Sequence, residues 1–304
     1  MAKIIIIGNS AAGFTCCDTL AKITRNNEIT IISEEKFPFY RRDRLFDYIA
    51  GTVDEKSLFA APGDYYSVEK IDFRSGQEVI KVDTKKQRVI LKDNSKLSYD
   101  FLVIASGSKI NLPDIPGTSK KGVISLSGLE EAMLIKEKLL IAGLICCVGK
   151  SNFCLNLTKV LLAKDKEVKA ITSDLWPEEP EEGKLEVLSG IAPVEIIGEG
   201  SELKAVKLSN GKAIGTNLII FGSDLVPSSD FLKDSGIHTE NGYITVDQSM
   251  RTNLDNVFAC GSVAVNKGDI GKEKDWIQSS KEGWVVANNL ISVFERGEYT
   301  CRKS

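Results

Sequence analysis

Apolar runs and helical spacing alternate at the start of the chain. An apolar run over 3–7 ends at Gly8, apolar residues then recur with helical spacing as far as Lys22, and a second apolar run covers 28–33. This order is typical of a βαβ unit of about 30 residues, in which two parallel strands flank one helix. The pattern therefore predicts a strand, a tight glycine turn, a helix and a second strand.

The same pattern returns in the second half of the chain. An apolar run from Leu144 ends at Gly149, and after a helical pattern another apolar run covers 168–172. The stretch 78–107 also shares its plan with 195–222, since each has short strands, a polar turn and an apolar strand that ends in glycine. Repetition in the same order predicts two related α/β domains of a Rossmann-like, three-layer type.

Proline and glycine positions set the expected domain limits. Pro113 follows the first copy, and the Asn-Gly pair at 241–242 is a hairpin signal after the second. We expect a first domain built from 1–112 and 241–304, with a second domain, 113–240, inserted into it.

Two helices are predicted outside the repeat. Ser127-x-x-Glu130 has the pattern of a capping box, which predicts a helix over 129–141. Apolar spacing predicts a second helix over 277–294. No low-complexity segment or long linker interrupts the pattern.

Composition and charge narrow the classes of protein. The chain has 304 residues, 39 Lys and Arg against 42 Asp and Glu, and 42% hydrophobic residues. The net charge of −3 and the ordinary apolar content disfavour a disordered chain or a basic nucleic-acid-binding protein. Apolar runs such as 139–147 are shorter than the ~20 residues of a membrane helix, and no signal peptide is evident. We expect a cytoplasmic protein that contacts neither nucleic acid nor membrane.

The cysteines and the histidine limit the chemistry further. Seven cysteines, most of them inside apolar runs, are typical of buried reduced thiols in a cytoplasmic protein. His238 is the only histidine and lies in a polar stretch, so most histidine-based catalysis is excluded.

The first glycine turn (residues 8–13) carries a nucleotide-binding pattern. Gly8-x-Ser10-x-x-Gly13 differs from the usual dinucleotide fingerprint only in the serine at the second glycine position. A small residue there lets the backbone approach a pyrophosphate, which the positive end of the following helix attracts. Glu34, 26 residues after Gly8 at the end of the next strand, is placed to bind ribose hydroxyls. The turn therefore predicts a dinucleotide site.

Further motifs give the sequence a family resemblance. They are Tyr40-x-Arg42-x-x-Leu45, Tyr99–Ser108, Gly242–Thr252 and Asn256–Ala264, added to the first glycine turn. With them the chain resembles the pyridine nucleotide–disulfide oxidoreductase superfamily of flavoproteins. Within that group it is most similar to the branch of rubredoxin reductases, NADH oxidases and the flavin domain of nitrite reductase. The resemblance implies two Rossmann-like FAD/NAD(P)-binding domains, with FAD in the first and NAD(P)H in the second.

By resemblance, the FAD contacts come from several segments of the chain. The first glycine turn would hold the pyrophosphate, Glu34 the ribose, and Arg42 would lie along the pyrophosphate and ribityl chain. Position 262 is nearly always an aspartate in the family, and Ser262 replaces that charged acceptor by a weaker hydroxyl. The full set implied is Gly8, Ser10, Ala11, Gly13, Glu34, Arg42, Val79, Ala105, Ser106, Gly107, Gly261, Ser262 and Ile277.

The second glycine turn (residues 149–154) departs from the family pattern. Only its first glycine remains, and Cys154 stands where a glycine normally lets helix and strand pack closely. We expect Cys154 to push that helix away. The stretch 176–190 is short and rich in proline and acidic residues, so it disfavours a helix and would repel a phosphate. Nicotinamide binding is therefore left open, with Gly149, Ser151, Asn152, Asp174 and Gly222 as its candidate residues.

Neither redox cysteines nor a catalytic side chain is expected at the flavin. Disulfide reductases need a nearby cysteine pair, and the segment 41–48 has no cysteine, so the chemistry would be centred on the flavin, without a metal. Arg41, Arg42 and Arg44 are open to two interpretations. They form either a basic surface for an acidic carrier protein, or a local set that pairs with neighbouring aspartates and the FAD phosphates, and we favour the second.

Three functions are consistent with the sequence. The first is an FAD-dependent oxidoreductase that passes electrons between NAD(P)H and a ferredoxin- or rubredoxin-like iron–sulfur carrier, because a flavin converts a hydride into single electrons. The alternative is a flavin-bearing electron-transfer subunit of a larger redox complex that no longer binds nicotinamide. The third is a structural or regulatory protein that has lost FAD.

The length of the chain adds one expectation. By resemblance, relatives in this branch continue into a C-terminal interface domain, and this sequence stops at Ser304, before such a domain. We therefore expect a flavin face open to another protein, while the oligomeric state is left undetermined.

Overall fold

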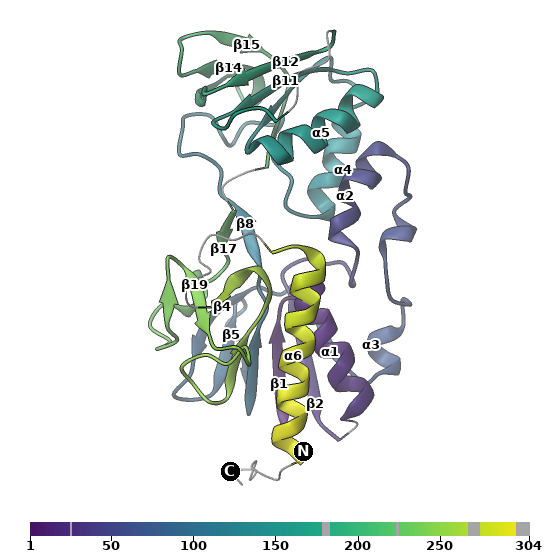
Figure 1. Cartoon of the computed structure of the whole chain (residues 1–304), viewed down its shortest axis with the longest axis vertical. Coiled ribbons are helices and arrows are strands. Elements are labelled where there is room, and N and C mark those ends of the chain that lie inside the picture. The colour runs from purple at the N-terminus through teal and green to yellow at the C-terminus, as the bar shows by residue number, and fades with distance from the viewer. Residues whose placement is uncertain (25, 178–182, 223–224, 267–273, 296–304) are drawn as a thin grey trace. The chain divides into compact units, whose positions relative to one another are not determined.

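The protein consists of two compact units. The computed structural model describes residues 1–304 except 25, 178–182, 223–224, 267–273 and 296–304, so the acidic run 178–182 and Cys301 lie outside the described residues (Figure 1). One unit contains residues 1–41, 59–108 and 227–304, and the other contains 42–58 and 109–226.

The first unit is built on a parallel sheet of five strands in the order β3-β2-β1-β7-β20. Ile7 of β1 lies opposite Ile32 of β2 on one side and Ile104 of β7 on the other. The predicted βαβ unit is confirmed, because α1 follows β1 directly and leads into β2. The elements are β1 Lys3–Ile7, α1 Ala11–Ile23, β2 Glu28–Ser33, β3 Asp72–Ser75, β7 Phe101–Ile104 and β20 Val257–Ala259.

The second unit repeats this sheet with the order β12-β11-β10-β16-β9. The helix α5 follows β10 as α1 follows β1, which confirms the predicted second copy. The outer strand β9 comes from before the copy in sequence, whereas its counterpart β20 comes from the C-terminal part of the chain. The elements are β9 Val123–Ser125, β10 Leu144–Val148, α5 Ser151–Ala163, β11 Glu167–Thr172, β12 Leu185–Ser189 and β16 Leu218–Phe221.

Each unit also carries a small antiparallel sheet, as the matching stretches 78–107 and 195–222 predict. A third small sheet contains the predicted hairpin, in which Asn241 and Gly242 have φ values of 51° and 82° that suit a tight turn. The strands are β4 Val79–Asp83, β5 Arg88–Leu91, β6 Lys96–Ser98, β13 Pro193–Glu199, β14 Glu202–Leu208, β15 Ala213–Gly215, β18 Thr239–Glu240, β19 Tyr243–Val246, β21 Ala264–Asn266, and the pair β8 Ser108–Ile110 with β17 Leu225–Pro227.

The predicted capping box is wrong. Gly128, in an extended conformation, is the N-cap of helix α4, and no side chain caps that helix. Ser127 therefore lies one residue outside the position from which its hydroxyl could accept from the first turn. The helix also ends at Lys138, three residues before the expected Ile141. The long C-terminal helix agrees with its prediction to within one residue at each end.

Four helices remain in the described structure, of which α6 is the longest. They are α2 Leu45–Ala50, α3 Tyr65–Val68, α4 Leu129–Lys138 and α6 Trp276–Glu295, with single 3₁₀ turns η1 Arg42–Arg44, η2 Lys56–Leu58, η3 Asp230–Leu232 and η4 Gly261–Val263. Among the helices of the described residues, none has the length and apolar character needed to cross a bilayer.

Segment 42–58 groups with the second unit because α2 packs on α4 and α5. Phe46 lies 5.8 Å from Phe153 between ring centroids, and the Nζ of Lys136 lies 4.1 Å from the ring of Tyr48. The limits expected from the sequence, 112/113 and 240/241, lie four and fourteen residues after the breaks at 108/109 and 226/227. Which cofactor each unit binds stays a prediction.

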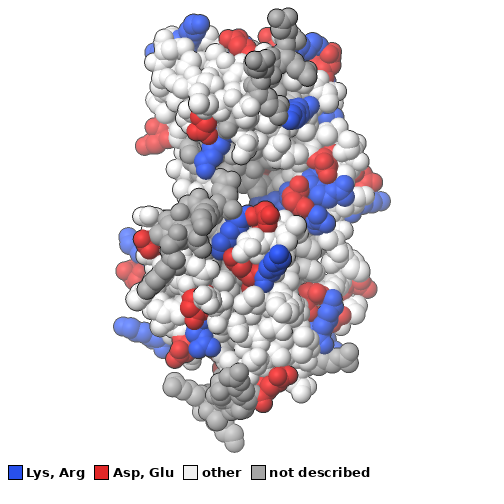
Figure 2. All heavy atoms as spheres, in the orientation of Figure 1, with Lys and Arg blue, Asp and Glu red and all other residues white. Residues whose placement is uncertain are grey.

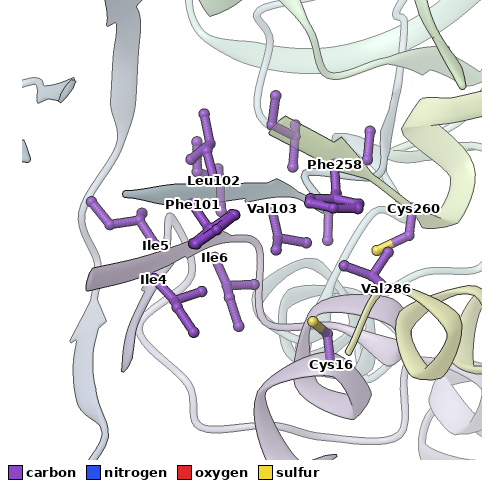
Figure 3. Packing of buried hydrophobic residues seen from close by; sticks show 14 of the residues in the cluster. Ile4, Ile5, Ile6, Cys16, Phe101, Leu102, Val103, Phe258, Cys260 and Val286 are labelled. Carbon is purple, nitrogen blue, oxygen red and sulfur yellow. The ribbon is translucent and has the colours of Figure 1, made fainter. Parts of the chain in front are cut away.

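The core of the first unit joins its sheet to α1 and α6, which lie side by side (Figure 1). Figure 3 shows Cys16 of α1 and Cys260 near Val286 of α6, among the apolar side chains of β1, β7 and β20. All three of these residues are fully buried. Their burial confirms that these cysteines serve as small apolar core residues.

Candidate functional site

The predicted FAD contacts of the first unit gather at one edge of its sheet. Gly8, Ala105 and Gly261 follow β1, β7 and β20 within two residues, and Glu34 directly follows β2. Parallel strands end at the same edge, which is where open α/β sheets bind ligands. The backbone holds this edge together, since the N–H of Ala105 donates to the carbonyl of Ile7 at 2.8 Å.

The first glycine turn leaves no room for side chains at its two glycines. A Cβ at Gly8, where φ is +106°, would lie 2.6 Å from the carbonyl carbon of Ala105, and a Cβ at Gly13 would lie 2.9 Å from that of Gly8. Ser10 is the N-cap of α1 and makes no side-chain capping bond, while Ala11 is the first helical residue. The first N–H groups of a helix have no partner within it and attract anions. The turn therefore fits a diphosphate.

Glu34, at the end of the neighbouring strand β2, lines a pocket of about 640 Å³. Glu78 and Lys92 form an ion pair at 2.7 Å in its wall, and the neighbouring Val79 is buried. Three carboxylates against one ammonium make the pocket acidic, which favours free ribose hydroxyls over a phosphorylated ribose. The lining residues are Glu34, Gly76, Gln77, Glu78, Leu91, Lys92 and Asp93.

The C-terminal part of the chain contacts the strand-end segment 105–108. The hydroxyl of Ser106 donates to the carbonyl of Ser228 at 2.7 Å, and the N–H of Ser228 donates to the carbonyl of Gly107 at 2.9 Å. The hydroxyl of Ser108 donates to the carbonyl of Ser262 at 3.2 Å. Ser262 therefore lies beside the segment that the sequence places against the same cofactor.

A buried ion pair, which sequence reasoning missed, holds the turn that contains Gly261. Glu282 of α6 accepts the N–H of Gly261 at 2.9 Å, and Lys274 lies 2.8 Å from the same carboxylate. No local sequence signal marks this pair, because its members are eight residues apart and meet only through tertiary packing. Ile277, expected at the flavin, is 63% exposed at the start of α6.

Tyr66 is a second missed residue of the first unit. Its hydroxyl accepts the N–H of Phe39 at 3.1 Å and the side-chain amide of Asn9 at 2.8 Å. Burial raises the pKa of Tyr66 to about 12, so the hydroxyl stays protonated. It thereby links the first glycine turn to the segment that follows Glu34.

The three arginines have different environments. Arg42 belongs to the second unit, where its guanidinium donates to the carbonyl of Ser127. Arg44 pairs with Asp47 at 3.2 Å, and Arg41 of the first unit lies 5.4 Å from the ring centre of Trp276. A contact of Arg42 with FAD stays a prediction.

The nicotinamide candidates gather at the corresponding edge of the second sheet. The N–H of Gly149 donates to the carbonyl of Ile171 at 3.1 Å, and the N–H of Gly222 donates to that of Val148 at 3.0 Å. Ser151 begins α5, and Asn152 next to it is exposed. Asp174 is also exposed and accepts the hydroxyl of Ser173 at 3.3 Å.

The space next to Gly222 is taken by an aromatic ring. The three atoms nearest to a Cβ placed at Gly222 all belong to the ring of Phe153. This ring in turn packs on Phe46. Cys154 is fully buried where Gly13 stands in the first unit. Aligning the two copies pairs Phe153 with Ala12, so this large residue was a signal in the sequence that we did not use.

The cysteines do not provide nucleophiles. All six in the described ranges are buried and free. Burial raises the pKa of Cys146 and of Cys154 to about 12 and that of Cys16 well above its usual value. A thiol is reactive as the thiolate, so these groups are inert near neutral pH.

Within the part of the chain that the structure describes, no three His, Cys, Asp or Glu residues are grouped as a metal site. On the face shown in Figure 2, basic and acidic side chains are interspersed.

Comparisons with known proteins match most of the chain. The family model described as pyridine nucleotide-disulphide oxidoreductase matches residues 2–287. The chain is 26% identical over 283 residues to the assimilatory nitrate reductase electron transfer subunit of Bacillus subtilis (strain 168), covering 88% of this chain and 36% of that protein. It is 28% identical over 309 residues to the benzene 1,2-dioxygenase system ferredoxin–NAD(+) reductase subunit of Pseudomonas putida, covering 95% and 74%.

The fold also matches solved structures. The covalent putidaredoxin reductase–putidaredoxin complex contains a chain that superposes with a TM-score of 0.88 at 18% identity, covering 96% of this chain and 75% of that one. At this identity the likeness concerns the fold. The chain spans about a third of the length of the Bacillus subtilis subunit and about three quarters of the Pseudomonas putida subunit.

Proposed function

The chain belongs to the pyridine nucleotide-disulphide oxidoreductase family, and from this membership we propose that it is an FAD-dependent oxidoreductase that passes electrons between NAD(P)H and a protein electron carrier. Members of the family bind FAD and use NAD(P)H. The carrier we propose is an iron–sulfur protein of the ferredoxin or rubredoxin type, since the Pseudomonas putida relative is by name a ferredoxin–NAD(+) reductase subunit.

The observation that carries the proposal is the first glycine turn with its pocket. Two glycines without room for a Cβ let the start of α1 approach a diphosphate, and Glu34 lines an acidic pocket at the end of the neighbouring strand β2. A dinucleotide needs both features at once, because its diphosphate and its ribose bind at adjacent strand ends.

The residues of the first unit would bind and orient the cofactor. Ser10 and the first N–H groups of α1 would bind the diphosphate, and Glu34 would accept from the ribose hydroxyls. Bound FAD supplies the chemistry that links two-electron and one-electron transfer. The buried thiols hold their protons, so Cys16 and Cys260 serve packing and take no electrons by disulfide exchange.

The test is the visible spectrum of the purified chain. We expect a flavin spectrum, before or after incubation with FAD, and its bleaching by NADH or NADPH without oxygen. Addition of a ferredoxin or a rubredoxin should then restore the oxidised spectrum. Protein that stays colourless after incubation with FAD contradicts the flavin assignment, and a flavin that neither nucleotide reduces contradicts the nicotinamide assignment.

A second candidate function rests on Phe153. Its ring lies on Gly222 and contacts Phe46, and Arg42 binds the carbonyl of Ser127 at the same sheet edge. These side chains take up space at the edge where a second dinucleotide would bind. They favour a flavin-bearing electron-transfer subunit that receives its electrons from another protein.

Replacing the ring distinguishes the two candidates. If the second holds, NADH reduces the wild-type flavin poorly, and Phe153→Ala lowers the NADH concentration for half-maximal reduction about tenfold. Leu155→Ala, on the same helix, is the control and should leave it unchanged. Efficient reduction of the wild type by NADH, with no gain in Phe153→Ala, rules out the second candidate.

A further inference from the structure

A buried ion pair joins the turn η4 to the helix α6. The Nζ of Lys274 lies 2.8 Å from the carboxylate of Glu282, and the two side chains are only 13% and 4% exposed. Burying two charges costs a large desolvation free energy. This cost is offset only where the remaining donors and acceptors of both groups also form hydrogen bonds.

The pair meets this condition. The ammonium of Lys274 has three donors, and besides Glu282 it contacts the carbonyl oxygens of Ala264 at 2.7 Å and Gly261 at 3.3 Å. The carboxylate of Glu282 accepts the N–H of Gly261 at 2.9 Å and the side-chain amide of Gln278 at 3.1 Å. The turn η4 is thus held at both its N–H and its carbonyl groups.

The held elements touch the first turn of α1. A Cβ at Gly261, where φ is +77°, would lie 3.0 Å from the Cβ of Ala12, and a Cβ at Gly283 would lie 2.9 Å from the carbonyl carbon of Ala12. Ala12 follows the first residue of α1, whose N terminus fits a diphosphate. The ion pair therefore braces the two elements that pack on the proposed diphosphate site.

We propose that Lys274 and Glu282 are a positioning pair for the FAD diphosphate, an inference that rests on the proposed FAD binding. The pair fixes the turn that contains Ser262, and its ammonium offsets a carboxylate that would otherwise repel the bound anion. Loss of Lys274 therefore leaves a buried negative charge beside the diphosphate, whereas loss of Glu282 leaves a positive one. The two losses differ in sign for anion binding.

The test measures FAD affinity in full-length variants, by quenching of flavin fluorescence after removal of the cofactor. Lys274→Met is expected to raise the Kd about tenfold or more, and Glu282→Gln less than about threefold, with the difference shrinking in high salt. The double variant Lys274→Met/Glu282→Gln carries no net charge change and should return to within about threefold of the wild type. Lys274→Arg keeps the charge and should do the same.

A matched pair supplies the control. Asp83 and Arg88 form an ion pair at 3.1 Å in the β4–β5 hairpin of the same unit, and Arg88→Met should leave the Kd unchanged. Equal losses in Lys274→Met and Glu282→Gln, or no loss in either, overturn the proposal. If Lys274→Met does not fold, the double variant decides, because a Kd raised as much as about tenfold there also overturns it. Failure of the wild type to bind FAD instead overturns the proposed function.

Discussion

Gly283 is the position where helix propensity and packing oppose each other most directly. It lies in α6 with an ordinary helical backbone, and its ideal Cβ would stand 2.9 Å from the carbonyl carbon of Ala12 and closer still to the oxygen. Ordinary contact begins at 3.4 Å. Gly283→Ala therefore forces α1 and α6 apart by more than the difference of 0.5 Å.

The packing effect is expected to win. Alanine improves the propensity of a helix by about 1 kcal/mol over glycine. Overpacking costs about 1–3 kcal/mol and sometimes more, and the clash is with backbone, because the oxygen of Ala12 belongs to the first turn of α1 and cannot rotate away. The upper end of this cost, less the gain in propensity, leaves a net loss of about 2 kcal/mol in the free energy of unfolding of Gly283→Ala. We also expect this variant to bind FAD more weakly.

Urea unfolding followed by circular dichroism measures the first effect, and quenching of flavin fluorescence the second. Gly63→Ala is the control, because a Cβ at Gly63 has no atom within 4 Å and φ is ordinary there; its effect should stay within about 0.5 kcal/mol. A Gly283→Ala variant as stable as the wild type, with unchanged FAD affinity, would refute the close approach of α1 and α6.

Two further predictions concern hydroxyl and thiol groups. Tyr66→Phe removes the hydroxyl that joins Asn9 to the N–H of Phe39. We therefore expect the free energy of unfolding, measured with urea, to fall by about 1–2 kcal/mol, and FAD to bind more weakly. An unchanged Kd for FAD contradicts the link to the first glycine turn. Burial raises the folded-state pKa of Cys146 and Cys154 to about 12. Below about pH 9 the folded and the unfolded chain both hold these protons, whereas above it only the unfolded chain loses them. The urea concentration at the unfolding midpoint should therefore decrease as the pH rises from about 9 to about 12. A midpoint that does not change over this pH range contradicts the prediction.

Much of the candidate site could be predicted because it depends on strand ends. Gly8 and Glu34 follow buried apolar runs, and parallel strands terminate at a common edge whatever the details of packing. The same holds for Gly149 and Gly222 in the second unit. The strands and turns that apolar periodicity and glycine positions indicate depend on neighbours in the chain, so they can be predicted without the tertiary structure.

Contacts between side chains far apart in the chain could not be predicted in this way. The cofactor contact of Arg42 stays a prediction, but the sequence did not show that its guanidinium donates to the carbonyl of Ser127 in the second unit. Ser127 in turn matched a capping pattern, but Gly128 takes the cap position. Both outcomes depend on how helices pack, which a short motif does not specify.

The sequence by itself determined the duplicated α/β architecture, the two glycine turns and the absence of a cysteine pair after Glu34. Only the tertiary structure decided that Lys274 meets Glu282 and that the ring of Phe153 lies on Gly222. The physical reason is that strands, helices and turns form from local backbone preference and apolar period. The partners of a buried charge or ring, in contrast, are set by close packing among segments far apart in the chain.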